Sequence, residues 1–247
     1  LGVGAERMTQ IKNKHGGSAI AGIASPRCSN EDNYVFQKFM RLACGSNNID
    51  SVSRAGYAAA QKYFEDVLGQ GVTANIIDGL RNSDTILVLG GDPSAINPIL
   101  GLAIREAFNR GSKVLLIGSA KGLERFKTMQ IVSELFREHE VAEALLRAVY
   151  RSRGDRGEKP ALDRRISELA EKTSQRKNID GFDEISKLIL QSKSLSIVFG
   201  PDLVQRTSGS RTLFAVAGLI YLLEARLYLL SERPNEQGLI DAGCVPD

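Results

Sequence analysis

The stretch that decides the fold is SDTILVLGGDP, residues 83–93. It holds a predicted strand, residues 84–89, whose apolar run ILVL at 86–89 ends at two glycines, an aspartate and a proline. A short run of this kind, without polar alternation, predicts a strand that is buried on both faces, as in a parallel sheet. Residues 94–109 predict a helix, and KVLLI at 113–117 predicts the next strand. Together they form a strand–helix–strand unit of about 30 residues, the usual length.

Strands and helices continue to alternate on both sides of this unit. Further strands are predicted at 18–24, 195–200 and 225–230. Further helices are predicted at 4–14, 29–44, 53–69, 75–81, 138–150, 162–173, 182–192 and 211–224. Residues 151–160 are charged and contain two glycines, so they predict a linker. This alternation predicts the α/β fold class, with doubly wound and mainly parallel sheets.

The composition excludes several classes of function. Of the 247 residues, 43% are hydrophobic and 25% are charged, which is typical of a soluble globular protein. The net charge of +3 is too small to indicate a phosphate-backbone partner, and the low aromatic content argues against base stacking. We therefore expect no nucleic-acid partner. The longest apolar run, 213–223, is about half of the ~20 residues that a membrane span requires, so we expect no direct span.

The potential metal ligands are few and poorly spaced. Cys28, Cys44 and Cys244 form no CxxC pair, so the sequence predicts neither a disulfide framework nor a four-thiolate iron–sulfur site, and a reduced cytoplasmic setting fits better. His15 and His139 are far apart and match no zinc-binding spacing. Nucleophile-elbow and P-loop motifs do not occur in the sequence. We expect no metal ligand and no catalytic residue.

The loop at Gly90, Gly91 and Asp92 has two interpretations. Glycines allow a ligand to approach the backbone, and free N–H groups at the start of a helix attract phosphate. The loop is not a GxGxxG fingerprint, however. A tight turn with Asp92 or Ser94 as the helix cap explains the same residues equally well. Both interpretations stay open on this local pattern.

Several stretches, taken together and in order, resemble the molybdopterin oxidoreductase family. Residues 25–34, SPRCSNEDNY, resemble its S-x-R-x-T-N-E-E-x-Y, and 37–41 resemble its QKxxR. Residues 45–50, GSNNID, are similar to G-T-N-N-x-D, and 83–98 are similar to A-D-x-x-x-x-x-G-x-N-P-x-x-x-x-P. Residues 235–243 resemble N-x-Q-G-x-x-D-x-G, a version found chiefly in the large subunit of NADH-quinone oxidoreductase.

The resemblance implies a cofactor-binding site, together with departures that make this site vestigial. Its residues would be Gly90, Gly91, Asp92, Asn235, Gln237 and Gly238. Gly56 and Tyr57 stand where active relatives have a metal-binding residue and its histidine neighbour. Asp92 replaces an asparagine that contacts nucleotide, and residues 118–121 replace a D-P-R motif. The resemblance therefore implies that molybdopterin guanine dinucleotide is not bound.

The implied function is that of a non-catalytic domain in the large subunit of an NADH-quinone oxidoreductase. Such a domain scaffolds electron transfer from NADH to quinone, with other peripheral-arm subunits of a respiratory complex as partners. Its place would be cytoplasmic, at the inner face of the membrane. Two alternatives stay open, namely part of a molybdopterin-dependent formate dehydrogenase-like enzyme and a free-standing Rossmann-like nucleotide binder.

The resemblance also implies how the domains are arranged. Both chain ends look like cut points in a longer protein, whose 4Fe-4S and 2Fe-2S clusters would precede Leu1. By fold analogy, we expect two interleaved Rossmann-like domains. Residues 1–50 with 157–247 would form the first, and residues 51–156 would be inserted as the second.

Overall fold

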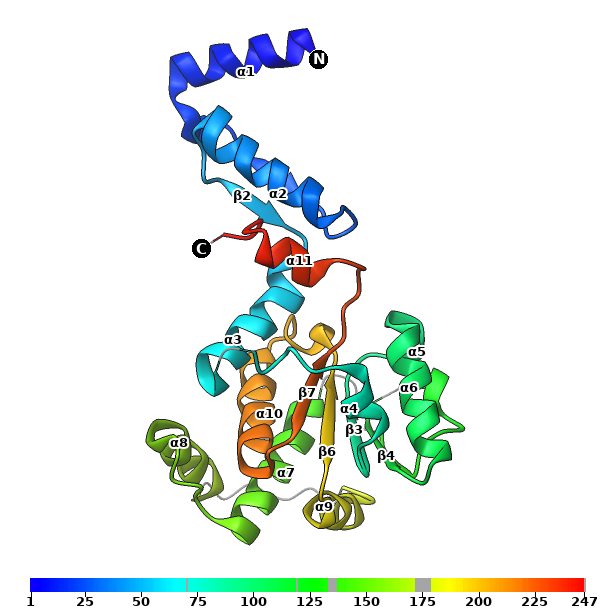
Figure 1. Cartoon of the computed structure of the whole chain (residues 1–247). Helices are drawn as coiled ribbons and strands as arrows, with labels where there is room; N and C mark the ends of the chain where they lie inside the picture. The colour runs from blue at the N-terminus through cyan, green and yellow to red at the C-terminus, as the bar shows by residue number, and fades with distance from the viewer. Residues whose placement is uncertain (70, 119, 133–136, 172–178, 247) are drawn as a thin grey trace. The chain divides into compact units, whose positions relative to one another are not determined.

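The chain forms two compact units in this computed structural model, as Figure 1 shows. Unit 1 comprises Leu1–Ala59 and Ser231–Asp247, and unit 2 comprises Ala60–Leu230. The structure describes residues 1–246 except 70, 119, 133–136 and 172–178.

Unit 2 is built around a five-stranded parallel sheet. Its strands are β3 (Thr85–Leu89), β4 (Lys113–Ile117), β5 (Met129–Ile131), β6 (Leu195–Phe199) and β7 (Arg226–Leu229). Their order in the sheet is β5-β4-β3-β6-β7, and each neighbouring pair is parallel. The chain leaves β3 towards β4 and β5 on one side, and later fills the other side with β6 and β7. This reversal of direction makes the sheet doubly wound, as the sequence predicts.

Helices cover both faces of this sheet (Figure 1). The helices of unit 2 are α3 (Ala59–Leu68), α4 (Ile77–Arg81), α5 (Pro93–Ile96), α6 (Pro98–Asn109), α7 (Glu138–Arg153), α8 (Pro160–Glu171), α9 (Phe182–Gln191) and α10 (Gly209–Leu223). Two 3₁₀ turns, η4 (Lys121–Leu123) and η5 (Pro201–Leu203), follow β4 and β6. α4 packs against α6 on one face, and α7 packs against α10 on the other.

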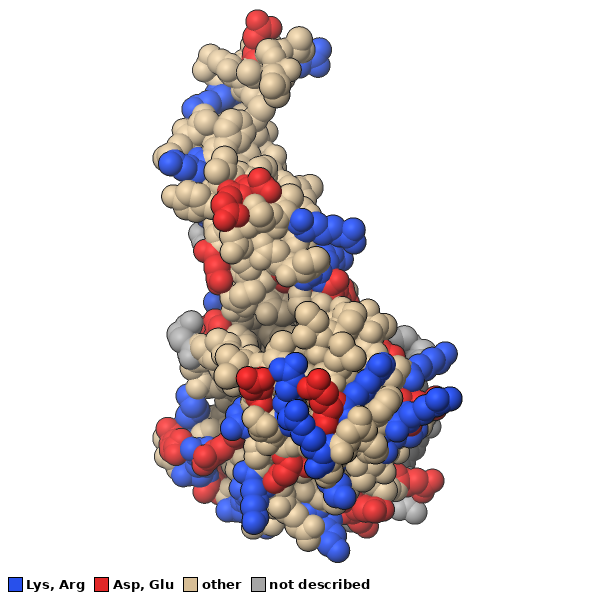
Figure 2. All heavy atoms as spheres, turned by 45° about the vertical axis from the view of Figure 1, so that its right-hand side comes forward, with Lys and Arg blue, Asp and Glu red and all other residues tan. Residues whose placement is uncertain are grey.

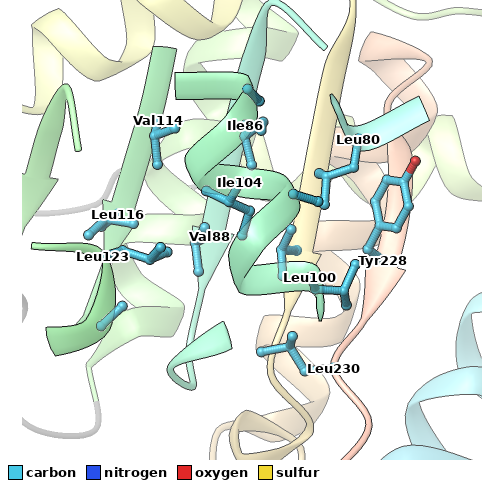
Figure 3. Close-up of a cluster of buried hydrophobic side chains, with 14 residues drawn as sticks. Leu80, Ile86, Val88, Leu100, Ile104, Val114, Leu116, Leu123, Tyr228 and Leu230 are labelled. Atoms are coloured by element: carbon cyan, nitrogen blue, oxygen red, sulfur yellow. The ribbon is translucent and has the colours of Figure 1, made fainter. Parts of the chain in front are cut away.

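The core explains why β3 is apolar without alternation. All five of its residues are buried. Ile86 and Val88 point to one face, where they join Leu100 and Ile104 of α6 in a buried cluster (Figure 3). On β6, the ring of Phe199 meets the ring of Phe64 from α3 edge to face, with the ring centroids 5.6 Å apart. A strand that is covered on both sides has no polar face to display.

Unit 1 is smaller and holds a two-stranded parallel sheet. Its elements are α1 (Gly2–His15), η1 (Gly17–Ala19), β1 (Gly22–Ala24), α2 (Asn30–Lys38), η2 (Phe39–Cys44), β2 (Ile49–Ser51), η3 (Arg54–Ala58) and α11 (Glu236–Asp241). α2 begins with a capping box, in which Ser29 Oγ accepts from the Asp32 N–H and the Asp32 carboxylate accepts from the Ser29 N–H. The helix continues to Cys44 as a π-helical turn, so it spans the region predicted as helical at 29–44.

Three short elements are not predicted from the sequence, and one predicted helix is divided. β2, β5 and α11 have three, three and six residues, too few for a hydrophobic period to be recognised. The helix predicted at 94–109 breaks before Pro98, where Asn97 Oδ1 accepts from the Leu100 N–H and starts α6. The predicted linker is shorter than expected, because α7 continues to Arg153.

The two compact units are divided differently from the predicted domains, whose boundaries (1–50 with 157–247, and 51–156) stay a prediction. A discontinuous unit is present, but residues 157–230 belong to unit 2 rather than with residues 1–50. The reason is strand pairing, since β6 pairs directly with β3 and β7 pairs with β6. Within the described ranges, no helix combines the length and the apolar character that crossing a membrane requires.

Two isoleucines of α6 test the packing of unit 2. Ile104 is fully buried, whereas Ile99 is 59% exposed on the same helix. We expect Ile104→Ala to lower the free energy of unfolding by about 2–5 kcal/mol, because it removes buried methyl groups and leaves a cavity. Ile99→Ala should change it by less than about 0.5 kcal/mol. Urea unfolding followed by circular dichroism measures both, and equal losses would contradict the described core.

Candidate functional site

The carboxyl ends of β3 and β6 are where ligands bind in open parallel sheets, because the strand order reverses between them. Gly90 and Gly91 follow β3, and Gly200 follows β6. The Gly200 N–H donates to the carbonyl oxygen of Leu89 at 2.9 Å. A Cβ added to Gly200 would lie 2.7 Å from the carbonyl carbon of Gly90. The two chain segments that leave these strands are therefore in backbone contact.

The predicted glycine loop is filled by side chains of unit 2. Gly90 and Gly91 have φ values of +68° and +63°, a conformation that favours glycine. A Cβ on Gly90 would lie 2.5 Å from Cγ of Leu203, which is 1% exposed. A Cβ on Gly91 would lie 2.9 Å from Cδ1 of Ile96. Internal packing is thus sufficient to require both glycines.

Asp92 is the helix cap that the second interpretation of the loop predicts. Its Oδ1 accepts from the Ser94 N–H at 3.0 Å, at the start of α5. Its Oδ2 accepts from the Gly122 N–H at 2.7 Å, which joins the loop to η4. Both carboxylate oxygens therefore bind protein N–H groups. An asparagine has one acceptor oxygen and could satisfy only one of these two donors.

A charged cluster that the sequence did not predict lies at the same edge of the sheet. Arg206 donates to Oε2 of Glu138 at 2.6 Å and to Oδ2 of Asp202 at 2.9 Å. Burial raises the pKa of the Asp202 carboxyl, and the nearby Arg206 charge opposes this rise. The other oxygen of Asp202 is buried without a hydrogen-bond partner among the described residues. The only sequence feature that could have indicated this cluster is the spacing of four residues between Asp202 and Arg206, which is typical of an ion pair on a helix.

The position that resembles the family's metal ligand lies in unit 1. Gly56 is buried in the π-helical turn η3. It has no side chain that could bind a metal. Next to it, the Tyr57 hydroxyl donates to Oε1 of Gln237 at 3.2 Å. In the part of the chain that the structure describes, no group of three or more His, Cys, Asp or Glu side chains could hold a metal ion.

The predicted residues near the C-terminus hold α11 against the loop that precedes α2. The Asn235 amide nitrogen donates to the Cys28 carbonyl and to Asn30 Oδ1, both at 2.9 Å. Its backbone N–H donates to the Pro26 carbonyl at 2.9 Å. A Cβ on Gly238 would overlap with Asn30 Oδ1, so any larger residue would displace that amide. These contacts give the motif a structural role within unit 1.

Glu236, which the sequence did not single out, is the most completely engaged acid of unit 1. It is 2% exposed. Its Oε1 accepts from Ser53 Oγ at 3.0 Å and from Arg233 at 3.3 Å, and its Oε2 accepts from Ser231 Oγ at 3.2 Å. The Glu232 N–H donates to the same Oε2 at 3.1 Å. A buried carboxylate with four donors fixes the start of α11.

The six predicted cofactor-site residues fall into two sets of three, one in each unit. Their placement is Gly90, Gly91 and Asp92 in unit 2, and Asn235, Gln237 and Gly238 in unit 1. These residues do not fit a molybdenum-bearing pterin dinucleotide. Position 56 offers no ligand atom, and the negative charge of Asp92 lies beside the loop N–H groups that would face a phosphate.

The surface of unit 2 does not present a continuous basic stripe on the face that Figure 2 shows. Lysine and arginine side chains alternate there with aspartate and glutamate. Arg81, for example, pairs with Asp78 at 2.8 Å and with Glu106 at 2.7 Å. Mixed charges of this kind are typical of a solvated surface.

The chain is similar in sequence to several known oxidoreductases. A family model described as molybdopterin oxidoreductase matches residues 3–226. The alpha subunit of an NADPH-Fe(3+) oxidoreductase from Geobacter sulfurreducens is 29% identical over all of this chain and 31% of its own length. Formate dehydrogenase H from Escherichia coli is 26% identical over 98% of the chain and 37% of its own length. A subunit of an NADH-quinone oxidoreductase from Rhizobium meliloti is 26% identical over 93% of the chain and 27% of its own length.

The chain therefore spans about a third of the length of these relatives. Among solved structures, acetylene hydratase from Pelobacter acetylenicus matches with a TM-score of 0.64 and 17% identity. The match covers 94% of this chain and 32% of that one. At this level of identity the likeness shows a shared fold, which agrees with the predicted α/β class.

Asp92→Asn tests the structural role of the carboxylate. The variant should lower the free energy of unfolding by about 1–3 kcal/mol, because an amide NH₂ would face either the Ser94 or the Gly122 N–H. Asp78→Asn is a control, since its carboxylate is 70% exposed and pairs with Arg81 at the surface. It should cost less than about 1 kcal/mol. Thermal and urea unfolding measure both, and a neutral Asp92→Asn would show that the two hydrogen bonds do not stabilise the loop.

Proposed function

Because the chain belongs to the molybdopterin oxidoreductase family, we propose that it is a cofactor-free, non-catalytic domain of a larger oxidoreductase subunit. The observation that carries this proposal is Gly56, which resembles in position the residue that binds molybdenum in active relatives. A buried glycine supplies neither a thiolate nor a carboxylate. The domain would keep the family fold and use it for assembly.

The loop at the carboxyl end of β3 supports the same proposal. The two oxygens of Asp92 bind the N–H groups of Ser94 and Gly122. Leu203 and Ile96 pack against the two glycines. A loop that is stabilised by its own protein contacts is stable without a dinucleotide, so unit 2 can fold in the absence of the pterin.

We propose that the larger assembly is of the NADH-quinone oxidoreductase type. One relative is a subunit of such an enzyme, and residues 235–243 resemble the version of the motif found in its large subunit. In this proposal the chain scaffolds electron transfer from NADH to quinone, while iron–sulfur clusters are carried elsewhere in the longer protein. Its partners would be other peripheral-arm subunits at the cytoplasmic face of the membrane.

Exposed apolar side chains along α2 and η2 support a docking role for unit 1. Val35, Phe39 and Leu42 are 62%, 45% and 72% exposed. Tyr34 is also exposed beside them. The spacing of four and three residues places Val35, Phe39 and Leu42 on one side of the helix. An exposed apolar side of this kind is typical of a face that another protein segment covers.

A second candidate function is part of a molybdopterin-dependent formate dehydrogenase-like enzyme. The observation that favours it is the 26% identity with formate dehydrogenase H over nearly the whole chain. In that case the full-length protein would bind the pterin through residues other than those identified above, and position 56 would not be the metal-binding position.

Molybdenum content separates the two functions. The protein, purified anaerobically at full length from its own cells, should contain less than about 0.1 molybdenum atom per chain, because Gly56 offers no ligand. Iron should be present if clusters accompany the chain. Elemental analysis by mass spectrometry gives both values, and formate dehydrogenase H purified in parallel is the positive control. Stoichiometric molybdenum would overturn the proposal.

Leu42→Glu tests the docking face of unit 1. A buried glutamate at a subunit contact costs several kcal/mol, so the variant should lose the subunits that co-purify with the wild type. Gln10→Glu adds the same charge on the exposed surface of α1 and serves as the control. Native mass spectrometry of the affinity-purified complex reports its composition. If Leu42→Glu assembles like Gln10→Glu, the face is not a docking surface.

A further inference from the structure

Three helices of unit 2 line a cavity, open to solvent, that the proposed function does not use. α7 packs against α8 and α10, and the three helices are visible together in Figure 1. The cavity has a volume of about 510 Å³. Its lining includes Glu143, Arg147, Arg165, Leu169, Arg211 and Phe214. None of these residues belongs to the six predicted cofactor-site residues.

The charges in this cavity do not cancel. Glu143, whose side chain is 6% exposed, accepts from Arg211 at 2.7 Å and 2.8 Å. It also pairs with Arg147 at 3.4 Å. One carboxylate thus faces two guanidinium groups. Glu168, which also lines the cavity, pairs with the outward Arg164 at 2.9 Å.

Arg165 adds a further positive charge to this excess. Within the described ranges, it has no carboxylate partner. Its guanidinium carbon lies 4.6 Å from the ring centroid of Phe214. Stacking on a ring fixes the plane of a guanidinium, and its N–H groups point along the edge of that plane, where an oxyanion can bind. The Arg165 charge also lies close to the Tyr63 hydroxyl. Three arginines and two glutamates line the cavity, a net charge of +1.

We propose that this cavity binds a small organic anion that carries a carboxylate or phosphate group. Arg165 supplies the charged contact, because a planar guanidinium can donate two parallel hydrogen bonds to such a group. Arg147 and Arg211 add to the positive field while they stay bound to Glu143. Phe214 and Leu169 form an apolar wall for the carbon part of the ligand.

The arrangement differs from an ordinary surface ion pair in one respect. Arg147 has two partners in the wall of the cavity. It pairs with Glu143, and it also donates to the Leu169 carbonyl at 3.1 Å. Its side chain is 13% exposed. The positive charge is therefore fixed in the wall of the cavity before any ligand arrives, so that little side-chain entropy is lost on binding.

Isothermal titration of the 247-residue protein at low ionic strength tests the proposal. Citrate is the carboxylate probe and adenosine monophosphate is the phosphate probe. We expect at least one to bind with one site per chain, and added salt to weaken the binding. Citrate alone would identify a carboxylate ligand, and the nucleotide alone a phosphate ligand. If neither binds at millimolar concentration, the proposal is overturned.

Two adjacent arginines provide a matched pair of variants. Arg165→Gln should weaken the binding by about tenfold or more, because it removes the charged donor. Arg164→Gln should change it by less than about twofold, since that side chain is 81% exposed and points to solvent. Arg165→Lys keeps the positive charge but loses the planar guanidinium that stacks on Phe214. Its affinity should therefore lie between those of Arg164→Gln and Arg165→Gln. Equal losses in Arg164→Gln and Arg165→Gln would place the anion outside the cavity.

A folding control distinguishes the loss of anion binding from the loss of folding. Circular dichroism and the melting temperature of each variant show whether unit 2 is intact. Phe214→Leu retains an apolar side chain but removes the ring under Arg165, and it should also weaken the binding. If Phe214→Leu binds like the wild type, Arg165 is not oriented by the ring and the proposed geometry is wrong.

Discussion

The burial of β3 on both faces is the constraint on which unit 2 depends. Its five residues contact a helical layer on each side, and its backbone pairs with β4 and β6. Every other strand takes its place relative to this one. The strand order reverses beside β3, so the carboxyl ends of β3 and β6 come together and bring Gly90 within contact distance of Gly200.

Ligands commonly bind at such a junction in open parallel sheets, and in this chain protein side chains pack against its glycines. Leu203 packs on Gly90, and Asp92 uses both oxygens to hold the starts of α5 and η4. The N–H groups of Ser94 and Gly122, which could otherwise bind a phosphate, donate to Asp92 instead. We therefore place the proposed functions on the exposed face of α2 and in the cavity between α7, α8 and α10.

Much of the candidate site could be located from the sequence, but not interpreted. The motifs gave Gly90, Gly91, Asp92, Asn235 and Gly238 as special positions, and each is indeed tightly constrained. The contacts of these residues could not be predicted. A glycine that makes room for a ligand and a glycine that makes room for Leu203 give the same sequence motif. Glu236 was missed for a similar reason, since its donors are brought together only by the return of the chain to unit 1.

The sequence by itself determined the α/β class, the buried central strands and the family. These follow from local composition and from ordered motifs, which act within a few residues of each other. Only the tertiary structure decided that β6 and β7 join the sheet of β3, and that residues 157–230 therefore belong to unit 2. Strand pairing joins residues about 110 apart in the chain, and no local pattern specifies which strand becomes the neighbour.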